Sequence, residues 1–220
     1  MDWGARYRLV TEDPGKIVSY LIGISCLLMR RADRRFHLGK GIKVYGRPIL
    51  DVRGKCTISI GDNVTIDSRN VGYFGSMFGP VKLFADIDGA SISIGANTFI
   101  HGSCLHAYNR IDIGENCLIA ANTQIVDSDG HDPFPSRPED RLKVKPTGIP
   151  IVIEDNVWIG MNCIILKGVH VGTGAVVGAG SVVRHDVPAY CLASGNPATV
   201  IKRVDRGSSA ERKANPLSSS

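Results

Sequence analysis

Residues 151–188 read IVIEDNVWIGMNCIILKGVHVGTGAVVGAGSVVRHDVP, and an aliphatic residue recurs in this stretch at every sixth position. An α-helix repeats near 3.6 residues and a strand near two, so neither element alone produces this period. A short strand followed by a tight corner does, and three such units close one triangular coil. Stacked coils form a parallel β-helix whose aliphatic positions, called rungs below, face the axis. The six rungs are Ile153, Ile159, Ile165, Val171, Val177 and Val183.

The residues between the rungs repeat as well. The residue directly after a rung is usually Gly, the third is usually Asn, and the fourth is small or β-branched. Gly allows a positive φ, and Asn tolerates one while bonding its own backbone. Three positions that agree on one period predict corners, and they argue against ordinary strands with accidental spacing. The Asn positions are Asn63, Asn97, Asn116, Asn122, Asn156 and Asn162.

Composition fits one all-β domain of 220 residues, because Gly is plentiful (25) and aromatic residues are scarce (6%). The net charge of +5 does not require a nucleic-acid partner, but it suits a phosphate-bearing ligand. The six cysteines show no CxxC pair and no metal-ligand spacing, so we expect neither a disulfide framework nor a metal. Cys117 and Cys163 are interpreted as buried thiols of a reducing compartment, which predicts a cytoplasmic protein.

The pattern divides the chain into four segments. We expect a polar lead and an apolar helix over residues 1–36, and the β-helix over 37–188. A cap follows over 189–204 and a disordered tail over 205–220. Inside the β-helix, residues 127–150 hold five prolines and break the period, so they are predicted to leave the prism as an excursion loop.

Two further irregularities interrupt the period. The step from Ile66 to Ile94 is not a multiple of six, which predicts irregular or wider coils over residues 68–90. The step from Ile100 to Ile113 is thirteen, which predicts one extra residue between His106 and Arg110.

Residues 17–29, IVSYLIGISCLLM, form the only long apolar run. Thirteen residues are too few to span a bilayer, and the flanks do not resemble a secretory signal. Arginines follow at once, at positions 30, 31, 34 and 35. One interpretation is a helix that packs on the prism or on a neighbouring subunit. The other is a peripheral contact of residues 17–35 with the inner, anionic face of a membrane.

The excursion opens with Asp127-Ser128-Asp129-Gly130-His131-Asp132. A regular coil presents aliphatic groups inward and solvated groups outward, whereas an imidazole at the root of a loop can project across a groove. Imidazole is a natural general base at physiological pH, and a nearby carboxylate can hold its second nitrogen. On composition alone, however, an ordinary surface histidine is the stronger interpretation of His131.

Four motifs change that balance: Gly130-His131, NVWIG (156–160), GAGSVV (178–183) and SGNPATVIK (194–202). In this order they resemble the hexapeptide-repeat acyltransferases, over about residues 90–204. The most similar subgroup is that of the maltose, galactoside and nodulation-factor O-acetyltransferases, with the colanic acid acetyltransferases nearby. The resemblance implies that the parallel β-helix is left-handed, and the short N-terminal helix and the protruding loop are predicted from the residues described above. It also implies a homotrimer with active sites between subunits.

The resemblance further implies an acetyl-CoA-dependent O-acetyltransferase that acts on a carbohydrate hydroxyl by direct transfer in a ternary complex. His131 would be the general base, with Trp158 and Asp132 beside the substrate. His101 and Ser103 stand where the family has an Asn-rich acceptor stretch, and this departure leaves the acceptor open. Resembling enzymes place the pantetheine arm along the coils and basic groups near the nucleotide phosphates. The residues that match these CoA contacts are Gly160, Met161, Ala179, Arg184, His185, Lys202 and Arg203.

Other functions remain open at this point. The pair His101 and His106 resembles part of the γ-class carbonic anhydrase site, but such a site needs three histidines and none lies between His37 and His101. Serine O-acetyltransferases carry a longer N-terminal domain than 36 residues can supply. A xenobiotic acetyltransferase, a sugar N-acetyltransferase and a non-catalytic β-helix scaffold stay as alternatives.

Overall fold

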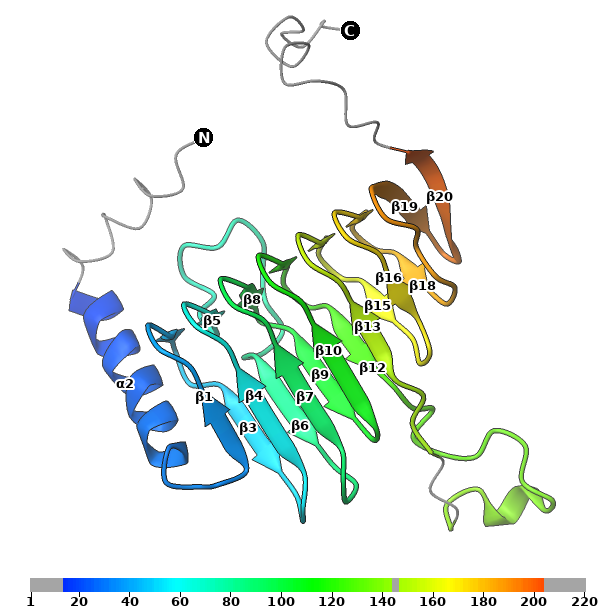
Figure 1. Cartoon of the computed structure of the whole chain (residues 1–220), viewed down its shortest axis with the longest axis horizontal. Helices are drawn as coiled ribbons and strands as arrows, with labels where there is room; N and C mark the ends of the chain where they lie inside the picture. Colours follow the sequence, from blue (N-terminus) through cyan, green and yellow to red (C-terminus); the bar gives the residue numbers. More distant parts are fainter. Residues whose placement is uncertain (1–13, 144–146, 204–220) are drawn as a thin grey trace, which may run out of the picture.

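The computed structural model describes residues 14–143 and 147–203, which form a three-sided prism of parallel strands with a helix at its N-terminal end (Figure 1). The predicted polar lead over residues 1–13 and the tail from residue 205 lie outside the described residues. Each side of the prism is one sheet, and consecutive strands of the chain pass from one sheet to the next until the last two strands, which share one sheet. The predicted parallel β-helix is therefore confirmed.

The three sheets are named A, B and C. Sheet A consists of β1 (Phe36–Leu38), β4 (Thr57–Ile60), β7 (Ser91–Ile94), β10 (Arg110–Ile113), β13 (Ile151–Ile153) and β16 (His170–Val171). Sheet B consists of β2 (Lys43–Tyr45), β5 (Thr65–Asp67), β8 (Phe99–His101), β11 (Leu118–Ile119), β14 (Trp158–Ile159), β17 (Val176–Val177), β19 (Cys191–Gly195) and β20 (Ala198–Arg203). Sheet C consists of β3 (Ile49–Val52), β6 (Lys82–Ala85), β9 (Cys104–Ala107), β12 (Gln124–Val126), β15 (Ile164–Ile165) and β18 (Val182–Val183).

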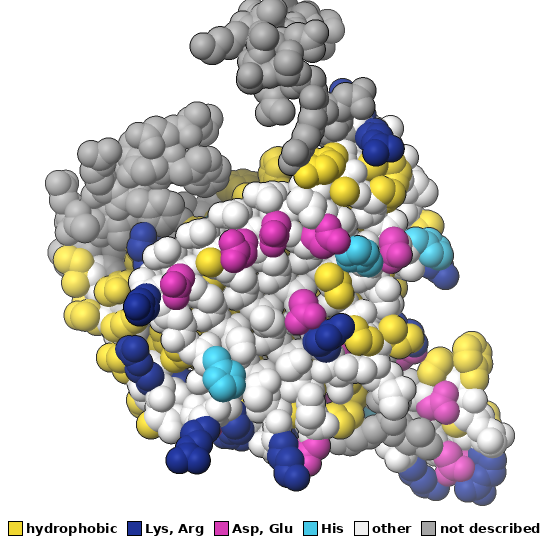
Figure 2. Space-filling view, viewed as in Figure 1, with side chains coloured by type: hydrophobic (Ala, Val, Ile, Leu, Met, Phe, Trp, Pro, Cys, Tyr) yellow, Lys and Arg dark blue, Asp and Glu magenta, His cyan; other side chains and the backbone are white. Residues whose placement is uncertain are grey.

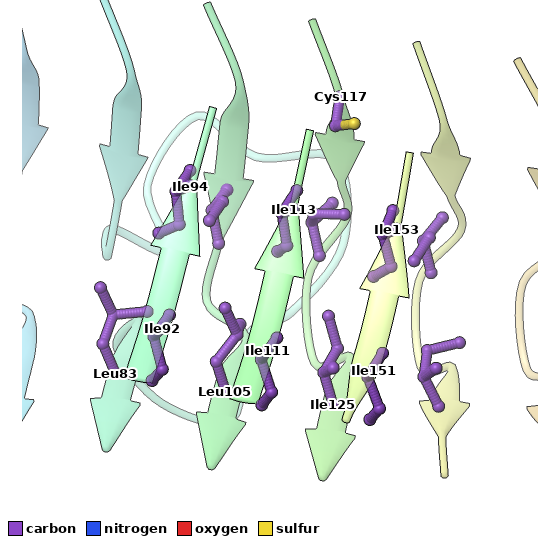
Figure 3. Close-up of a cluster of buried hydrophobic side chains, with 14 of the residues drawn as sticks. Leu83, Ile92, Ile94, Leu105, Ile111, Ile113, Cys117, Ile125, Ile151 and Ile153 are labelled. Atoms are coloured by element: carbon purple, nitrogen blue, oxygen red, sulfur yellow. The ribbon is translucent and has the colours of Figure 1, made fainter. Parts of the chain in front are cut away.

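The rungs fill the prism and stack in register. Ile119 pairs with Ile159, which in turn pairs with Val177 on the next coil, and none of the three is more than 1% exposed. Figure 3 shows the same arrangement on sheet A, where Ile94, Ile113 and Ile153 form a row that runs from coil to coil. Each fully buried Ile or Val stabilises the fold by about 1.5–3 kcal/mol through removal from water. The ladder is thus the main source of stability.

Asparagines hold the corners as predicted. The six Asn residues that follow the rungs all have a positive φ, between 56 and 64°. Most side chains avoid this region because Cβ crowds the backbone, whereas Asn tolerates it. Each of these six corners therefore closes with the same backbone conformation at Asn, which keeps the rungs beside them in register.

The thirteen-residue step from Ile100 to Ile113 is divided differently from the prediction. Strand register places Leu105 in the sheet C rung, five residues after Ile100 and eight before Ile113. The corner at Gly102, with φ of 30°, is thus one residue shorter than a regular corner, and the next is two residues longer. A single extra residue is the net of these two changes, so the period alone could not separate them.

Two segments leave the prism. Residues 68–81 leave between β5 and β6, so a loop interrupts regular coils where irregular coils were expected. Residues 127–150 leave between β12 and β13 and carry the short 3₁₀ helix η1 (Pro138–Asp140). Figure 1 shows this second segment extending away from the prism body.

The two ends of the prism are closed in different ways. Helix α2 (Pro14–Arg30) covers the N-terminal end, where Gly23 lies so close to the backbone of Val44 that a Cβ would clash with its carbonyl oxygen. At the other end, β20 folds back antiparallel on β19. No helix in the described part of the chain is long and apolar enough to cross a membrane. Cys117 and Cys163 are free thiols, 2% and 0% exposed, as predicted.

Candidate active site

The excursion loop is attached through Asp127, whose carboxylate is fully buried at the end of β12. Its Oδ1 accepts a hydrogen bond from the backbone N–H of Tyr108 (2.7 Å). Its Oδ2 accepts two more, from the N–H groups of Asn109 (2.7 Å) and Arg110 (2.8 Å). The Asn109 amide then donates to the carbonyl of Gly148 (3.0 Å), near the return of the loop. Both ends of the loop are therefore fixed to one corner of the preceding coil.

His131 lies four residues beyond this root, and its side chain is exposed. The neighbouring carboxylates are engaged elsewhere. Asp129 forms an ion pair with Lys167, and Asp132 accepts the backbone N–H two residues further on (2.9 Å). Among the described residues, no carboxylate is hydrogen-bonded to the His131 ring. Within one chain, the expected carboxylate that would fix the ring is therefore not supplied by this cluster.

His101 lies on sheet B with its ring between two aromatic rings. The ring centroids of Tyr73 and Phe99 are 4.4 and 4.2 Å away. Burial lowers the pKa of His101 to about 4, so the ring is neutral at physiological pH. Its Nδ1 is buried and has no hydrogen-bond partner among the described residues. Its predicted place beside the acceptor stays a prediction.

Ser103 was predicted beside the acceptor as well, and its placement removes the basis for that prediction. The residue is 1% exposed. Its Oγ lies 2.8 Å from the carbonyl oxygen of Ala120 and accepts the N–H of Thr123 (3.3 Å). The hydroxyl thus holds two coils together inside the prism, where an acceptor does not reach.

Trp158 points outward from sheet B and is 51% exposed. Strand register places it in a row of outward apolar side chains, one from each successive coil. We call this row the apolar column, and it consists of Phe99, Leu118, Trp158, Val176 and Leu192.

Gly160, Met161 and Ala179 lie on two successive coils at the corner between sheets B and C. A Cβ at Gly160 would be 2.6 Å from the backbone nitrogen of Ala179, so the two coils touch there and only Gly fits. The Met161 side chain reaches the loop 68–81, where its Cε would be 3.0 Å from a Cβ at Gly75. The structure therefore brings these three predicted CoA contacts together.

The loop 68–81 stands beside this corner and is fixed to it. The Tyr73 hydroxyl accepts the N–H of Ala121 (3.2 Å), and the Asn122 side chain accepts the N–H of Phe78 (2.8 Å). The loop thus forms a wall next to the predicted pantetheine contacts. Sequence reasoning missed this wall, because the irregular spacing of residues 68–90 does not show where the loop folds.

Arg184, His185, Lys202 and Arg203 are exposed at the C-terminal end of the prism. The first two follow β18 and the others lie on β20, and these two strands contact each other. In the described ranges none of the four forms an ion pair, so this end presents a cationic surface that suits phosphates.

The predicted site is divided within one chain. The loop of His131 starts from sheet C and returns to sheet A, whereas Trp158 lies on sheet B and Met161 at the B–C corner. Sheet B and the C–A corner lie on different sides of a triangular prism. The structure therefore groups the predicted CoA contacts and leaves the predicted base apart from them.

Sequence reasoning also missed a polar cluster on sheet C. The His106 ring stacks on Phe84, with centroids 4.4 Å apart, and its Nε2 lies 3.5 Å from the Asp86 carboxylate. Burial outweighs that carboxylate and lowers the pKa of His106. Asp86 also pairs with Arg53 (2.6 Å). His106 and His101 thus lie on different sheets, and the described residues hold no group of three side chains that could bind a metal ion.

Family models match both sides of the excursion. The bacterial transferase hexapeptide model (six repeats) matches residues 150–185, and the hexapeptide repeat of succinyl-transferase matches residues 91–126. The chain therefore contains hexapeptide repeats, and its prism is the left-handed parallel β-helix of such proteins.

Curated relatives carry acetyltransferase names. A protein of Schizosaccharomyces pombe named as an acetyltransferase is 37% identical over 122 residues, covering 53% of this chain and 55% of its own. A Saccharomyces cerevisiae protein with the same kind of name is 38% identical over 117 residues, covering 53% and 58%. The 2,3,4,5-tetrahydropyridine-2,6-dicarboxylate N-acetyltransferase of Staphylococcus aureus is 52% identical over 59 residues, covering 27% and 25%. The chain thus spans little more than half of the yeast relatives and a quarter of the bacterial one.

Solved structures show the same architecture. A hexapeptide-repeat containing acetyltransferase of Vibrio cholerae has a TM-score of 0.53 at 25% identity, covering 88% of this chain and 94% of its own. The N-acyltransferase AntD of Bacillus cereus, crystallised with dTDP and coenzyme A, has a TM-score of 0.61 at 22% identity, covering 82% and 89%. At that identity the likeness to AntD concerns the fold.

Proposed function

We propose that this protein is an acetyl-CoA-dependent O-acetyltransferase that acetylates a carbohydrate hydroxyl, with His131 as general base. Acetyltransferase names among the curated relatives and the likeness to the Vibrio cholerae acetyltransferase support the class of reaction. The observation that carries the assignment to this chain is an exposed imidazole on a loop whose root is fixed to the prism by a buried carboxylate.

The reaction needs one proton transfer and one displacement. The imidazole of His131 accepts the proton of the acceptor hydroxyl while that oxygen attacks the thioester carbonyl. The C–S bond then breaks, and the coenzyme A thiolate leaves with the proton that the imidazole returns. Binding both reactants in one cleft replaces a bimolecular encounter, so no acyl-enzyme is required.

The donor is proposed to lie along the corner between sheets B and C. Its pantetheine arm would follow Gly160, Met161 and Ala179, where the small residues Gly160 and Ala179 let a ligand approach the backbone. Its phosphates would meet the cationic end of the prism, for which Arg184 and Lys202 are the leading contacts. Trp158 lies on sheet B beside this path and would wall the reacting groups.

A second copy of the chain is needed to complete this site, which supports the proposed homotrimer. The apolar column leaves sheet B with an outward face unlike that of a solvated sheet. Sheet A, drawn in front in Figure 1, is instead mostly polar at its outward positions. These positions are His37, Ser59, Ser93, Asp112, Val152 and His170. Burial of the apolar column against a neighbour would let the neighbour's His131 loop reach the Trp158 side of the cleft.

Assembly can be tested with a matched pair of substitutions. We expect light scattering to give a mass near three times 23.7 kDa for the unaltered chain. Trp158→Glu places a charge in the apolar column and should yield monomers, whereas Ser93→Glu on sheet A should leave the mass unchanged. A Trp158→Glu protein with an unchanged mass would exclude sheet B from the interface.

One specific observation favours N-acetylation as a second candidate: the 52% identity with the Staphylococcus aureus N-acetyltransferase segment. The two candidates differ in product chemistry, because mild alkali cleaves an acetyl ester and spares an acetamide. We would assay thiol release from acetyl-CoA across sugars, nucleotide sugars, amino sugars and hydroxyl-bearing antibiotics. Alkali-labile product with a sugar supports O-transfer to carbohydrate. Alkali-stable product, an antibiotic-only acceptor or no acceptor-dependent thiol release contradicts it.

A further inference from the structure

The outer face of α2 is apolar along its whole described length. Residues 17, 18, 21, 22, 28 and 29 lie on one side of the helix and are apolar, and each is 45–72% exposed. Their spacing matches a single stripe of a helix with 3.6 residues per turn. Ser25, the one polar residue in this stripe, donates its hydroxyl proton to the carbonyl of Leu21 (2.7 Å). The stripe therefore presents an apolar surface that is interrupted only at Ser25.

The opposite side of α2 is already used. Leu27 is 6% exposed and belongs to the core, and Gly23 touches the backbone of β2. The helix is thus held in place as the lid of the prism, and the apolar stripe faces away from it. A stripe needed only for folding would face inward, so this one is available to something outside the described chain.

Positive charge surrounds the stripe. Residues 14–50, which form α2 and the first coil, contain eight Lys or Arg and one Asp, whereas the whole chain contains 26 and 21 basic and acidic residues. That one acid, Asp33, is paired with Arg35 (2.7 Å). Arg31, Arg34, Lys40 and Arg47 are exposed. Figure 2 shows hydrophobic side chains at the α2 end of the molecule with Lys and Arg side chains beside them.

Two hollows flank the helix and combine both properties. One, of about 480 Å³, is lined by Met29, Ile49 and Leu50 together with Arg30 and Arg47. The other, of about 280 Å³, is lined by Leu27, Leu28 and Ile42 together with Arg31 and Lys40. An apolar floor beside cations suits an acyl chain below an anionic headgroup. The same features would not suit a neutral protein surface equally well.

We propose that the α2 end of the prism docks on an anionic phospholipid bilayer, with the apolar stripe in the headgroup and acyl boundary and the arginines at the phosphates. A 17-residue helix can lie in the plane of the interface, and it does not have to be long enough to cross the bilayer. The exposed cations Arg31, Arg34, Lys40 and Arg47 supply the attraction to anionic lipid, and the stripe supplies the buried apolar area. This docking is independent of the proposed acetyl transfer.

The test is co-sedimentation of the full chain with phosphatidylcholine vesicles that do or do not contain phosphatidylserine. Binding is expected with phosphatidylserine, and it should weaken as salt screens the charges. Arg31→Gln with Arg34→Gln should lower the partition coefficient about 25-fold, since each cation near such a surface contributes roughly fivefold. The matched control, Arg141→Gln with Lys143→Gln in the excursion loop, should bind like the unaltered protein.

The apolar contribution has its own matched pair. Leu21→Ser with Leu28→Ser should weaken vesicle binding at least tenfold, because both side chains are more than half exposed and each would bury its apolar area in the bilayer. Phe134→Ser with Leu142→Ser removes even more exposed apolar groups, 90% and 81% exposed, from the excursion loop and should have no effect. Circular dichroism shows whether each variant is folded.

Three results would overturn the proposal. The first is no sedimentation with phosphatidylserine vesicles at low salt. The second is equal loss of binding in the loop controls. The third is a larger assembly in light scattering that the Leu21→Ser and Leu28→Ser pair abolishes, which would show that a second copy of the chain occupies this face.

Discussion

The coil from Ile153 to Val171 and the excursion loop 127–150 use similar lengths of chain in opposite ways. The coil turns three corners in eighteen residues, and its strands pair with the coils on both sides. The loop leaves the prism for twenty-four residues and carries side chains such as Phe134 and Leu142, which are 90% and 81% exposed. The coil therefore contributes buried packing, and the loop carries exposed side chains away from the prism.

This difference separates stability from chemistry. The side chain of a rung residue is almost completely buried, so its truncation leaves a cavity and destabilises the fold. A side chain on the exposed loop has little packing to lose, so its loss should act on turnover alone. Substitutions in the two regions should therefore move different measurements.

The largest expected effect is that of His131→Ala. Removal of a general base should lower turnover by about 10²–10⁴. The melting temperature should stay within a degree or two of the original, because the ring is exposed. Thiol release from acetyl-CoA and thermal denaturation measure the two quantities. Undiminished turnover would remove His131 from the reaction.

Mixed assemblies sharpen the same comparison. His131→Ala disables the loop, and Ala179→Trp blocks the corner where the donor is proposed to lie. If the site forms between subunits, about one quarter of the sites in an equal mixture combine an intact loop with an intact corner. Co-expression of the two inactive variants should then restore activity. No recovery in mixed trimers of confirmed composition would place both groups in one subunit.

The next effect belongs to the prism. Ile159→Ala opens a cavity in the ladder and should lower the free energy of unfolding by about 2–5 kcal/mol. Urea denaturation measures it, and the folded fraction should keep its turnover. Ile164→Ala, at an outward position of sheet C that is 38% exposed, is the control and should cost less than half as much. Equal losses at both positions would contradict the ladder as the main source of stability.

A smaller effect concerns pH. The folded-state pKa of His101 is about 4, below the unfolded value of 6.5, so the folded state favours the neutral ring. The resulting stability is present above pH 6.5 and is lost as pH falls towards 4, by about 2–3 kcal/mol. His101→Gln should flatten the stability curve over this range, whereas His37→Gln, on the exposed face of sheet A, should not. A His101→Gln curve parallel to the original would show that this ring is not the titrating group.

The smallest effect is on donor binding. Arg184→Ala and Lys202→Ala should each raise the KM for acetyl-CoA about three- to tenfold, since exposed charge pairs contribute little each. The KM for the acceptor should change less. Lys40→Ala, at the far end of the prism, is the control. A larger change for the acceptor than for acetyl-CoA would move the donor away from this cationic surface.

The sequence predicted the prism well because its repeat is redundant. The rungs, the Gly positions and the Asn positions each carry the same period, so an interruption in one leaves the others readable. The six positive φ angles at Asn confirm this at the level of single residues. The corner at Gly102 was missed because a shorter corner and a longer one nearly cancel in the count.

The candidate site was less predictable, because its residues do not share the repeat. His131 was singled out by resemblance, and its role stays a prediction. Ser103 stands three residues after the rung Ile100, and nothing in the sequence separates it from the surface residues that follow other rungs. Only the short corner at Gly102 turns its hydroxyl into the prism. The ion pair between Asp129 and Lys167 joins residues 38 positions apart, and nothing local signals it.

The strand order of sheet A also fixes the distance between the excursion loop and the α2 end of the prism. Four steps separate β1, next to α2, from β13, where the excursion loop returns, and each step is about 4.8 Å. The loop therefore stands roughly 19 Å above the end of the prism that carries α2. On a docked protein, the coils would act as a spacer that selects acceptors reaching this distance from the bilayer. Insertion of one further eighteen-residue coil between them would increase this distance by about 4.8 Å and leave the excursion loop and the α2 end unaltered.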